Sequence, residues 1–591
     1  MMRIEEINSI VENFLVEKEV RSENANIRDS IALLNTRLGS DNNIRYAIAN
    51  SPAGKYHLSG EIYLHNLTES LFLPHCISYD LLQLISEGFQ GIHVKSKPPK
   101  RFSALLGQCL SLLSNAGTLS SGAQSLSYLP LYAAPFLYYI KYTEEEVYQA
   151  LEEFVYALNS AVMRASFQSL FVNITLNFDI PKEMKDVPVI WNGETQKETY
   201  GEFQEELDRF NYHYLKLMRA GFADGSPFTF PILTIYTNDA VFEKDEKYPV
   251  REELWKLTAK YSLPNFTSRR GNKDKFSKQS LCCHLSIDAE EIYRSFSGAG
   301  IWDLSAGFLG TVGGVQVVTI NIAMGALLHP NDFDDWLTEI LAASNDHINF
   351  CRNCIDRARR AGLLPVLDYY IGDLRKSFFN IIGVAGFNEA TKFLFGEGLT
   401  STESQKWTLE KLALIRDWIS EHTADGFLKG LEAPPIENAK GFLARKIRER
   451  FPDVELPGGK TPYLTPGCNF PLEAENLTEE IIWRSKSDPY FNSGNIHFSN
   501  IFERITPEIA KRYIDRLTKR TDIGYEAINA SLCICKEHGI FYGRIEKCPK
   551  CNKTLRRFTR VVGYFVDLNN FSPHNKQNFL DRRNYELNKV I

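Results

Sequence analysis

The chain has 591 residues, of which 44% are hydrophobic and 24% are charged, which is ordinary for a soluble globular protein. Its net charge of −6 gives no global argument for a protein that wraps nucleic acid. The sequence has no apolar run of about 18 uncharged residues, which argues against a membrane span. Its N-terminus is acidic, which argues against a secretory signal. Eleven unevenly spaced cysteines argue against a secreted disulfide framework and for a reducing compartment, so we expect a cytoplasmic protein.

Helical and β-rich segments alternate along most of the chain. The spacing of apolar residues predicts helices within 1–50, 143–165, 200–220, 331–362 and 406–431, with Thr143 as the N-cap of the second. Runs of β-branched and aromatic residues predict strands within 169–178, 226–237, 280–288 and 310–322. This alternation favours an α/β fold whose strands are buried between helices.

A cysteine cluster near the C-terminus has the spacing of a zinc site. Cys548 and Cys551 form a CxxC pair, and Cys535 and His538 form a CxxH pair upstream of it. Zn²⁺ takes four sulfur or nitrogen ligands in a tetrahedron, so three cysteines with one histidine and four cysteines both satisfy it. We favour Cys535, His538, Cys548 and Cys551, with Cys533 as the reserve ligand. Four protein ligands leave no open position, which indicates a structural metal.

The segment Arg560-Val561-Val562-Gly563-Tyr564 follows this site closely. Taken alone, it is typical of a buried strand with a glycine where a neighbour approaches closely. Behind a four-ligand metal site, it resembles the C-terminal domain of the anaerobic (class III) ribonucleoside-triphosphate reductases, which are glycyl radical enzymes. In that family the glycine of an R-[VI]-x-G-Y motif carries the stored radical, and the matching position is Gly563.

Further motifs resemble the same family and occur in its order. They are Glu23-Asn24-Ala25-Asn26 and the segments 57–67 (HLSGEIYLHNL), 280–288 (SLCCHLSID), 312–321 (VGGVQVVTIN) and 461–471 (TPYLTPGCNFP). The likeness runs from about residue 20 to the end of the chain, and the joint presence of the motifs is more specific than any one of them. The chain departs from the pattern at His284, where Arg is usual, at Asn66, where Asp is usual, and after Tyr564, where the expected Trp and Gly are missing.

The resemblance implies a ten-stranded α/β barrel of two five-stranded halves, of the glycyl radical enzyme type, with an inner cysteine finger loop. We expect this catalytic domain, with its N-terminal helices, over residues 1–525 and a zinc-ribbon and glycyl radical domain over residues 526–591. The family pattern begins almost at Met1. We therefore expect no ATP-cone domain, and no overall control by ATP or dATP, unless a segment has been removed.

The implied reaction is anaerobic reduction of ribonucleoside triphosphates to 2′-deoxyribonucleoside triphosphates for DNA precursor synthesis. The Gly563 radical would take hydrogen from a cysteine on the finger loop, and the resemblance assigns this role to Cys283, with Cys282 as the fallback. Cys76 resembles a second family cysteine near the 2′ face of the substrate, and Asn321 would point to substrate or formate. From the sequence alone, these residues also fit packed core cysteines and a turn asparagine.

The resemblance also implies partners. These are ribonucleoside triphosphate substrates, dNTP or ATP effectors, and a separate radical-SAM activating enzyme that installs the radical with S-adenosylmethionine. The reductant is formate or a thioredoxin/glutaredoxin-like redoxin, and we expect an allosteric homodimer without a membrane or nucleic-acid partner. The pair Cys351 and Cys354 fits either a redox site or two cysteines on one helix face. Segments 461–467 and 120–123 are candidate phosphate loops.

Two other interpretations remain open at this point. Another glycyl radical enzyme, of the formate-lyase or dehydratase type, would share the glycine and the cysteine but does not usually carry a zinc knuckle immediately before the glycine. A zinc-ribbon nucleic-acid-binding protein would share the metal site. The negative net charge and the lack of a long Lys/Arg-rich stripe beside the cysteines argue against that second class.

Overall fold

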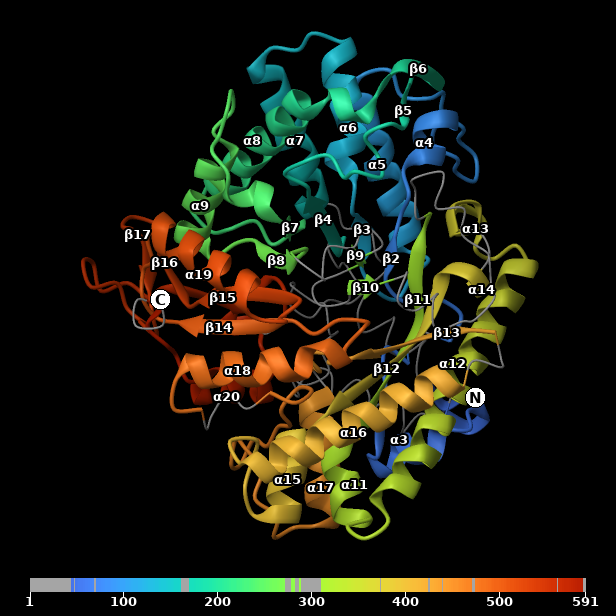
Figure 1. Ribbon diagram of the computed structural model, residues 1–591, viewed down its shortest axis with the longest axis vertical. Coiled ribbons are helices and arrows are strands. Elements are labelled where there is room, and N and C mark those ends of the chain that lie inside the picture. The colour runs from blue at the N-terminus through green and yellow to red at the C-terminus, as the bar shows by residue number, and fades with distance from the viewer. Residues whose placement is uncertain are drawn as a thin grey trace, which may run out of the picture.

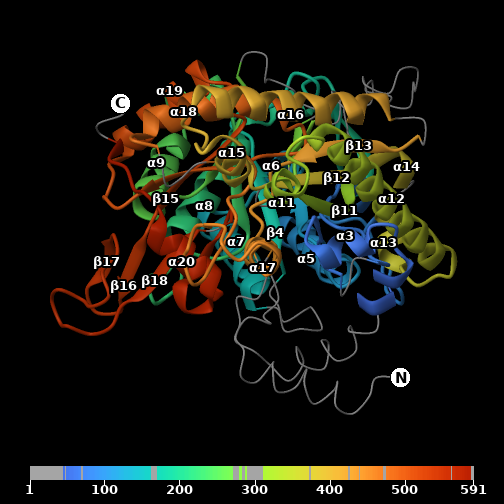
Figure 2. The same cartoon turned by 90° about the horizontal axis from the view of Figure 1, so that it is seen from below.

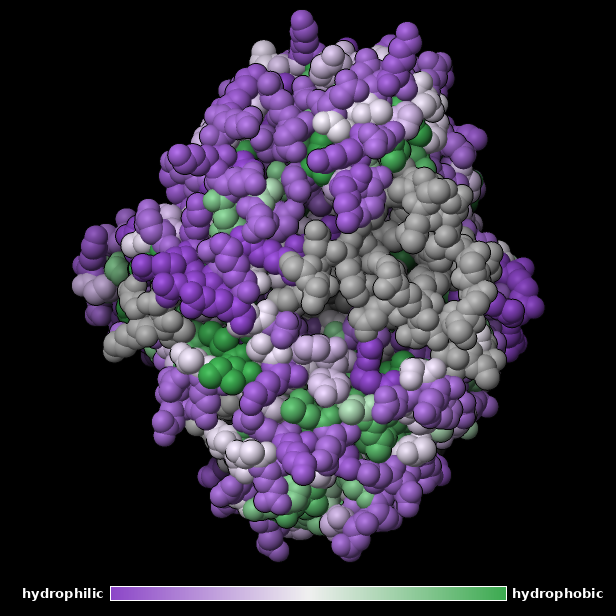
Figure 3. Space-filling view, in the orientation of Figure 1, coloured by the Kyte–Doolittle hydropathy of each residue, from purple (hydrophilic) through white to green (hydrophobic). Residues whose placement is uncertain are grey.

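The computed structural model covers all 591 residues. It describes residues 44–46, 48–67, 71–160, 170–270, 278–281, 286–288, 310–371, 374–422, 426–437, 439–469, 474–560 and 562–587. Within these ranges no helix combines the length and the hydropathy needed to cross a bilayer. Where Figure 3 is coloured, the face that it shows is mostly hydrophilic, with small hydrophobic areas between hydrophilic ones.

Ten strands of one large sheet form two five-stranded halves. Neighbouring strands in the strand order are parallel within each half. The two halves join through the antiparallel pairs β2–β11 and β8–β15. The first half consists of β2 (Ile77–Ser78), β3 (Gln124–Leu126), β4 (Val172–Leu176), β7 (Ile232–Thr237) and β8 (Asn265–Ser268). The second half consists of β11 (Val312–Asn321), β12 (Phe378–Ala385), β13 (Leu428–Glu432), β14 (His497–Ile501) and β15 (Tyr525–Ala530).

Backbone hydrogen bonds close this sheet into a barrel. The two ends of the strand order are β13 and β14. The Ser493 amide donates to the Leu431 carbonyl at 2.9 Å, and the Ala433 amide donates to the Gly494 carbonyl at 3.0 Å. A parallel bridge joins Ala433 to Asn495. The ten-stranded barrel of two five-stranded halves is therefore confirmed.

Helices cover the outside of the barrel because parallel strands need crossover connections. Figure 1 shows the helices of the first half at the top and most of those of the second half below and to the right. The first half carries α4 (Leu82–Glu87), α5 (Phe102–Gly117), α6 (Leu129–Tyr139), α7 (Glu144–Ser160), α8 (Gln204–Ala220), α9 (Val250–Tyr261) and the hairpin β5 (Pro188–Trp191) with β6 (Glu194–Thr199). The second half carries α11 (Ile322–Leu328), α12 (Phe333–Arg360), α13 (Pro365–Ile371), α14 (Leu374–Ser377), α15 (Phe387–Phe395), α16 (Thr402–Glu421), α17 (Ala439–Arg450), α18 (Leu477–Ser487) and α19 (Pro507–Arg520).

A short hairpin lies inside the ring of strands. It consists of β9 (Lys278–Ser280) and β10 (Ser286–Asp288), which pair antiparallel and appear near the centre of Figure 1. The predicted strand over 280–288 is therefore divided between the two arms of this hairpin, with residues 282–285 outside the described ranges. The hairpin occupies the position expected of the inner finger loop.

A small four-stranded sheet follows the barrel. It has the order β17-β16-β18-β19 and consists of β16 (Leu532–Cys535), β17 (Gly539–Tyr542), β18 (Arg556–Arg560) and β19 (Phe565–Asp567), followed by α20 (Pro573–Asp581). Figure 2 shows β16–β18 at one edge of the molecule. Strand β15 pairs with β8 and β14, so the expected boundary at 525/526 falls inside a barrel strand and the small sheet begins after it.

Most of the predicted elements agree with the structure. Helix α7 begins after Thr143, whose Oγ1 accepts the Glu146 amide at 3.2 Å while the Glu146 carboxylate accepts the Thr143 amide at 2.7 Å, a capping box. The helix predicted over 406–431 was wrong in its last third. It ends at Glu421, and residues 428–432 form the buried strand β13. The sequence of this strand, LKGLE, contains Lys429 and Glu432 and therefore does not show the alternating or continuous apolar pattern of a buried strand.

Two sequence motifs meet at Asn321. Strand β1 (Ile62–Leu64), from the segment 57–67, pairs antiparallel with the end of β11. Asn321 then caps α11, because its Oδ1 accepts the Met324 amide at 3.1 Å while its Nδ2 donates to the Gly60 carbonyl at 2.8 Å. Both polar atoms of this buried side chain are engaged with backbone, which agrees with the turn-residue interpretation.

We expect Asn321→Ala to lower the free energy of unfolding by about 1–3 kcal/mol, because it removes a cap and leaves a buried carbonyl without its donor. Urea unfolding measures this change. Ser401→Ala is the matched control, since Ser401 is the N-cap of α16 but makes no side-chain cap hydrogen bond. Equal stability of the two variants would contradict a structural role for Asn321.

Candidate functional site

Gly563 lies in the turn of a hairpin that enters the barrel. It follows β18 and precedes β19, which pair antiparallel, and it is buried. Its neighbours Val562 and Tyr564 belong to one cluster of buried apolar side chains with Cys76 and Leu281. A residue without a side chain in a buried turn is the arrangement that a backbone-centred radical requires, because water and oxygen are kept away from its Cα.

Tyr564 anchors this hairpin on the first half of the barrel. Its ring lies 5.2 Å from that of Phe171 and 5.4 Å from that of Phe230, measured between centroids. Phe171 directly precedes β4, and Phe230 lies two residues before β7. The hairpin is therefore packed at the N-terminal ends of neighbouring parallel strands.

A buried arginine fixes the strand that leads to Gly563. Arg560 has no exposed surface, and its guanidinium donates to Asn265 Oδ1 and to the carbonyls of Ser262 and Ile528. Burial lowers the pKa of Arg560 to about 9, which still leaves the side chain charged at neutral pH. Asn265 Nδ2 in turn donates to the Gly563 carbonyl at 3.0 Å. One asparagine thus joins the buried cation to the glycine.

The same asparagine begins a chain of hydrogen bonds across the barrel interior. Asn265 Nδ2 also lies 3.4 Å from the Tyr525 hydroxyl, which lies 3.1 Å from Thr234 Oγ1. Thr234 Oγ1 donates to Asn173 Oδ1 at 2.9 Å, and Asn173 Nδ2 lies 3.4 Å from the Ser280 carbonyl. Every side chain in this series of hydrogen bonds is buried. The Gly563 turn and the inner hairpin are therefore connected through polar groups of β8, β15, β7 and β4.

Ser280 holds the inner hairpin in the barrel. Its carbonyl accepts hydrogen bonds from Ser125 Oγ at 2.7 Å and Ser127 Oγ at 3.0 Å, and its amide donates to the Tyr236 hydroxyl at 3.3 Å. The expected relay residues Cys282 and Cys283 directly follow Leu281 and lie outside the described residues, as do His284 and the segment 23–26. The structure therefore fixes only the arm that leads to these cysteines.

Cys76 lies where the two halves of the barrel meet. It directly precedes β2, and its Sγ accepts the Ala123 amide at 3.3 Å. A Cβ on Gly122 would lie 2.7 Å from this sulfur, so the loop 120–123 needs its glycine to approach the cysteine. Cys76 shares its buried cluster with the neighbours of Gly563.

The four favoured metal ligands come together. One ligand atom each from Cys535, His538, Cys548 and Cys551 lie within 4.8 Å of one another. Cys533 lies two residues away on β16 and belongs to the same buried cluster, but its thiol donates to the Gly543 carbonyl at 3.2 Å. Three sulfurs and one imidazole nitrogen at this spacing fit a tetrahedral zinc ion.

Cys351 and Cys354 are two buried cysteines on α12. Cys351 Sγ lies 3.5 Å from His347 Nε2, and burial raises the pKa of both thiols. A raised pKa disfavours the thiolate that disulfide exchange requires. The interpretation as two cysteines on a helix face is the better supported one.

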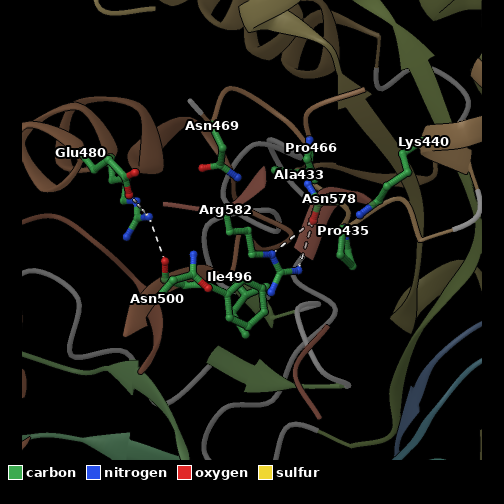
Figure 4. A pocket seen from close by; sticks show the side chains of 12 residues that line it. Ala433, Pro435, Lys440, Pro466, Asn469, Glu480, Ile496, Asn500, Asn578 and Arg582 are labelled. Atoms are coloured by element: carbon green, nitrogen blue, oxygen red, sulfur yellow. Dashed lines mark hydrogen bonds and ion pairs between the residues drawn. The ribbon is translucent and has the colours of Figure 1, made fainter. Parts of the chain in front are cut away.

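A polar pocket lies beside the strand that leads to Gly563. It contains about 670 Å³ of space, part of which is open solvent. Figure 4 shows Lys440 from α17 and Arg582 beyond α20 reaching into it from different walls. Pro466, from the expected phosphate loop 461–467, also lines this pocket. The other expected loop, 120–123, lies next to Cys76 instead.

Sequence reasoning missed several residues of this site. Asn265 is one polar residue at the start of a β-rich run, and Lys440 and Arg582 stand in ordinary charged segments. Arg560 was recognised as part of a motif but without a role. Their partners lie up to 298 positions away in the chain, so no local spacing indicates them. Burial of a polar or charged side chain inside the fold is the signal that identifies Asn265, Lys440 and Arg560.

Comparison with known proteins gives a family and a fold. The family model for anaerobic ribonucleoside-triphosphate reductase matches residues 23–585. A structure of the anaerobic ribonucleotide reductase from Thermotoga maritima, in complex with dATP and CTP, is similar over 98% of this chain and 94% of that chain, at 20% identity and a TM-score of 0.75. A second anaerobic ribonucleotide reductase structure is similar over 98% of this chain and 93% of that chain, at 20% identity and a TM-score of 0.74.

A third structure, of the Thermotoga maritima enzyme with dATP bound in its specificity site, covers 96% of this chain and 99% of that chain, at 20% identity and a TM-score of 0.71. No curated protein matches the sequence. At this identity the structures establish the shared fold, while the family model spans nearly the whole chain. The chain belongs to the anaerobic ribonucleoside-triphosphate reductase family and is an oxidoreductase that reduces ribonucleotides.

Proposed function

We propose that this enzyme works through a radical stored on Gly563 and a thiol on the inner hairpin. The observation that carries this proposal is the buried Gly563 turn, tied by Asn265 and three further side chains to the Ser280 carbonyl two positions before Cys282. In the family that the motifs resemble, the glycine stores the radical and the hairpin cysteine acts on the ribose.

In the proposed reaction, the oxidised Gly563 Cα takes the hydrogen of the Cys283 thiol, and the sulfur-centred radical takes the 3′-hydrogen of the ribose. The 2′-hydroxyl then takes a proton and leaves as water, and an external reductant supplies two electrons with the second proton. The cysteine finally returns its hydrogen to C3′ and regains the radical. Cys282 is the alternative thiol. Cys76, which belongs to the same buried cluster as Leu281 of the inner hairpin, is proposed to serve the 2′ face.

The partners are proposed on the same basis. The Thermotoga maritima structures hold dATP and CTP, and one holds dATP in a specificity site. We propose that this chain likewise takes a ribonucleoside triphosphate as substrate and a nucleoside triphosphate as allosteric effector, as a homodimer in the cytoplasm. A radical-SAM activase would install the radical, and formate or a redoxin would supply the electrons.

Cys535, His538, Cys548 and Cys551 are proposed to hold a structural zinc ion. Strand β16, which carries Cys535, pairs with β18, which leads through Arg560 to Gly563. A metal that fixes the ends of β16 and the following loops would therefore support the strand on which the radical hairpin depends. Four protein ligands complete its coordination, so it supplies no reaction chemistry.

We expect anaerobic incubation of the full chain with its activase, S-adenosylmethionine and a reductant to give an EPR doublet near the free-electron position. Gly563→Ala should give no such signal. Cys283→Ser should keep the doublet but form no deoxynucleotide, because the radical is stored and cannot be relayed.

The paired variants separate storage of the radical from its use. A doublet of unchanged intensity in Gly563→Ala would reject Gly563 as the radical residue. Full turnover by Cys283→Ser, with Cys282→Ser inactive, would move the relay to the neighbouring cysteine.

Elemental analysis should find about one zinc ion per purified chain, in line with a four-ligand structural site. Cys548→Ser should lose most of this zinc and melt at a lower temperature, because structural metal binding contributes to folding. Cys533→Ser is the control, since its sulfur donates to a carbonyl outside the four-ligand cluster. Zinc content that falls in Cys533→Ser but not in Cys548→Ser would refute the assigned ligand set.

A further inference from the structure

The segment that follows the Gly563 hairpin connects the small C-terminal sheet to the barrel. It consists of α20 and the tail after it, residues 573–587, and is called the C-terminal segment below. The segment lies in the part of the chain that departs from the family pattern after Tyr564. Its contacts are therefore a feature of this chain that the motifs do not explain.

Helix α20 packs on the strand that leaves the Gly563 turn. Phe579 of α20 forms a buried apolar cluster with Leu568 and Phe571, and Val566 of β19 packs against this cluster. All four residues come from β19, from α20 and from the short connection between them. The helix and the hairpin are thus one packed unit with an apolar cluster of its own.

An arginine of the small sheet holds the end of α20. Arg544 lies between β17 and β18. Its guanidinium donates to the carbonyls of Phe579, Leu580 and Arg582 at 2.7, 2.8 and 2.9 Å. Carbonyls at the end of a helix have no partner inside the helix, so these bonds complete α20. Arg582 Nη1 then donates to the Arg560 carbonyl at 2.7 Å, which joins the helix to β18 as well.

Hydrogen bonds also join α20 to the barrel. His574 Nδ1 donates to the Pro462 carbonyl at 2.7 Å, and its Nε2 accepts Arg445 Nη1 at 2.9 Å. At the other end of the helix, the Tyr463 hydroxyl donates to Asp581 Oδ2 at 2.9 Å. Bonds of this kind can break at modest net cost, because water replaces the lost partners.

The tail after α20 is anchored on the second half of the barrel. The Tyr585 amide donates to the Asn500 carbonyl of β14 at 2.8 Å, and the Tyr585 hydroxyl donates to Glu480 Oε1 of α18 at 2.7 Å. The Leu587 amide donates to Glu503 Oε1 at 2.9 Å, and the Leu587 side chain is buried. The C-terminal segment is therefore bonded at one side to the sheet and hairpin and at the other side to the barrel.

The burial of Gly563 makes these contacts matter for activation. The proposed activase is a separate protein that must reach the glycine Cα, which is buried in the closed structure. We propose that residues 573–587 are a releasable clasp. While its barrel contacts are made, the hairpin stays in the barrel; when they break, hairpin and α20 leave together and expose Gly563. The proposal rests on the function proposed above, since the exposure serves the installation of the radical.

The first test is hydrogen exchange of the full, unactivated chain, followed by mass spectrometry. We expect Tyr585→Phe to speed exchange in residues 562–567 and in α20 by the same factor, about 10-fold. The variant removes a hydrogen bond to a charged acceptor from the closed state alone, and exchange follows the population of the open state. Glu480 stays paired with Arg484, so the variant leaves no buried charge alone.

Tyr139→Phe is the matched control. It removes a bond of 2.6 Å from another half-buried tyrosine to a carboxylate, that of Glu198, and should leave both segments at the wild-type rate. The amides of β11 report on the barrel and should be unchanged in both variants. Faster exchange confined to residues 583–587 would mean that the tail frays without releasing anything, and faster exchange in β11 would mean a general loss of stability. Either result would overturn the clasp.

The second test follows activation by EPR under anaerobic conditions with limiting activase. The doublet of Tyr585→Phe should grow about 10-fold faster than that of the wild type and reach the same intensity, because the open state is more populated. It should also decay faster in air. Equal growth and decay in the two proteins would contradict the clasp. A wild type without a doublet would instead reject the proposed radical, and the exchange test would then decide the clasp by itself.

Discussion

The buried charge of Arg560 is the constraint on which the reaction centre depends. A guanidinium without exposed surface needs hydrogen-bond acceptors inside the protein, because an unpaired buried charge costs several kcal/mol. Both Nη groups of Arg560 have such acceptors, while its Nε has none among the described residues. Here the acceptors are the Ser262 and Ile528 carbonyls and Asn265 Oδ1, and no carboxylate pairs with Arg560 within the described residues. These acceptors lie at or just before the start of β8 and within β15, so the charge has its acceptors only when β18 is docked against the barrel. The position of Gly563, three residues further on, follows from that docking.

The architecture of the barrel explains how two distant segments reach one interior. The halves meet through antiparallel pairs, β2 with β11 and β8 with β15. The polar interior of the first half receives the β9–β10 hairpin at Ser280, while the Gly563 hairpin packs at the N-terminal ends of β4 and β7. Buried polar groups are tolerated there because they satisfy one another in a connected network. The same network fixes the relative positions of the Gly563 turn and the Ser280 arm, the two segments between which the proposed relay would move hydrogen.

The sequence could predict those parts of the molecule whose partners lie nearby in the chain. Thr143 and Glu146 form their capping box three residues apart, and the four ligand atoms of the metal cluster come from a short segment. The barrel itself was expected from the resemblance of ordered motifs rather than from periodicity. Strand β13 was missed because five buried residues carry no period that separates strand from helix. Asn265 was missed because its contact with Gly563 spans 298 positions, which no local pattern encodes. Lys440 and Arg582 were missed because only the fold brings α17 and the end of α20 to the same pocket.

The central claim is that Arg560 and Asn265 hold the Gly563 turn closed inside the barrel before any radical forms. Hydrogen exchange of the backbone amides of residues 562–564, followed by mass spectrometry on the full, unactivated chain, tests it most directly. The account predicts strong protection in the wild type and much faster exchange in Asn265→Asp. That variant keeps an acceptor for Arg560 but removes the donor to the Gly563 carbonyl. Exchange at the rate of an open loop in the wild type, or equal protection in both proteins, would contradict it.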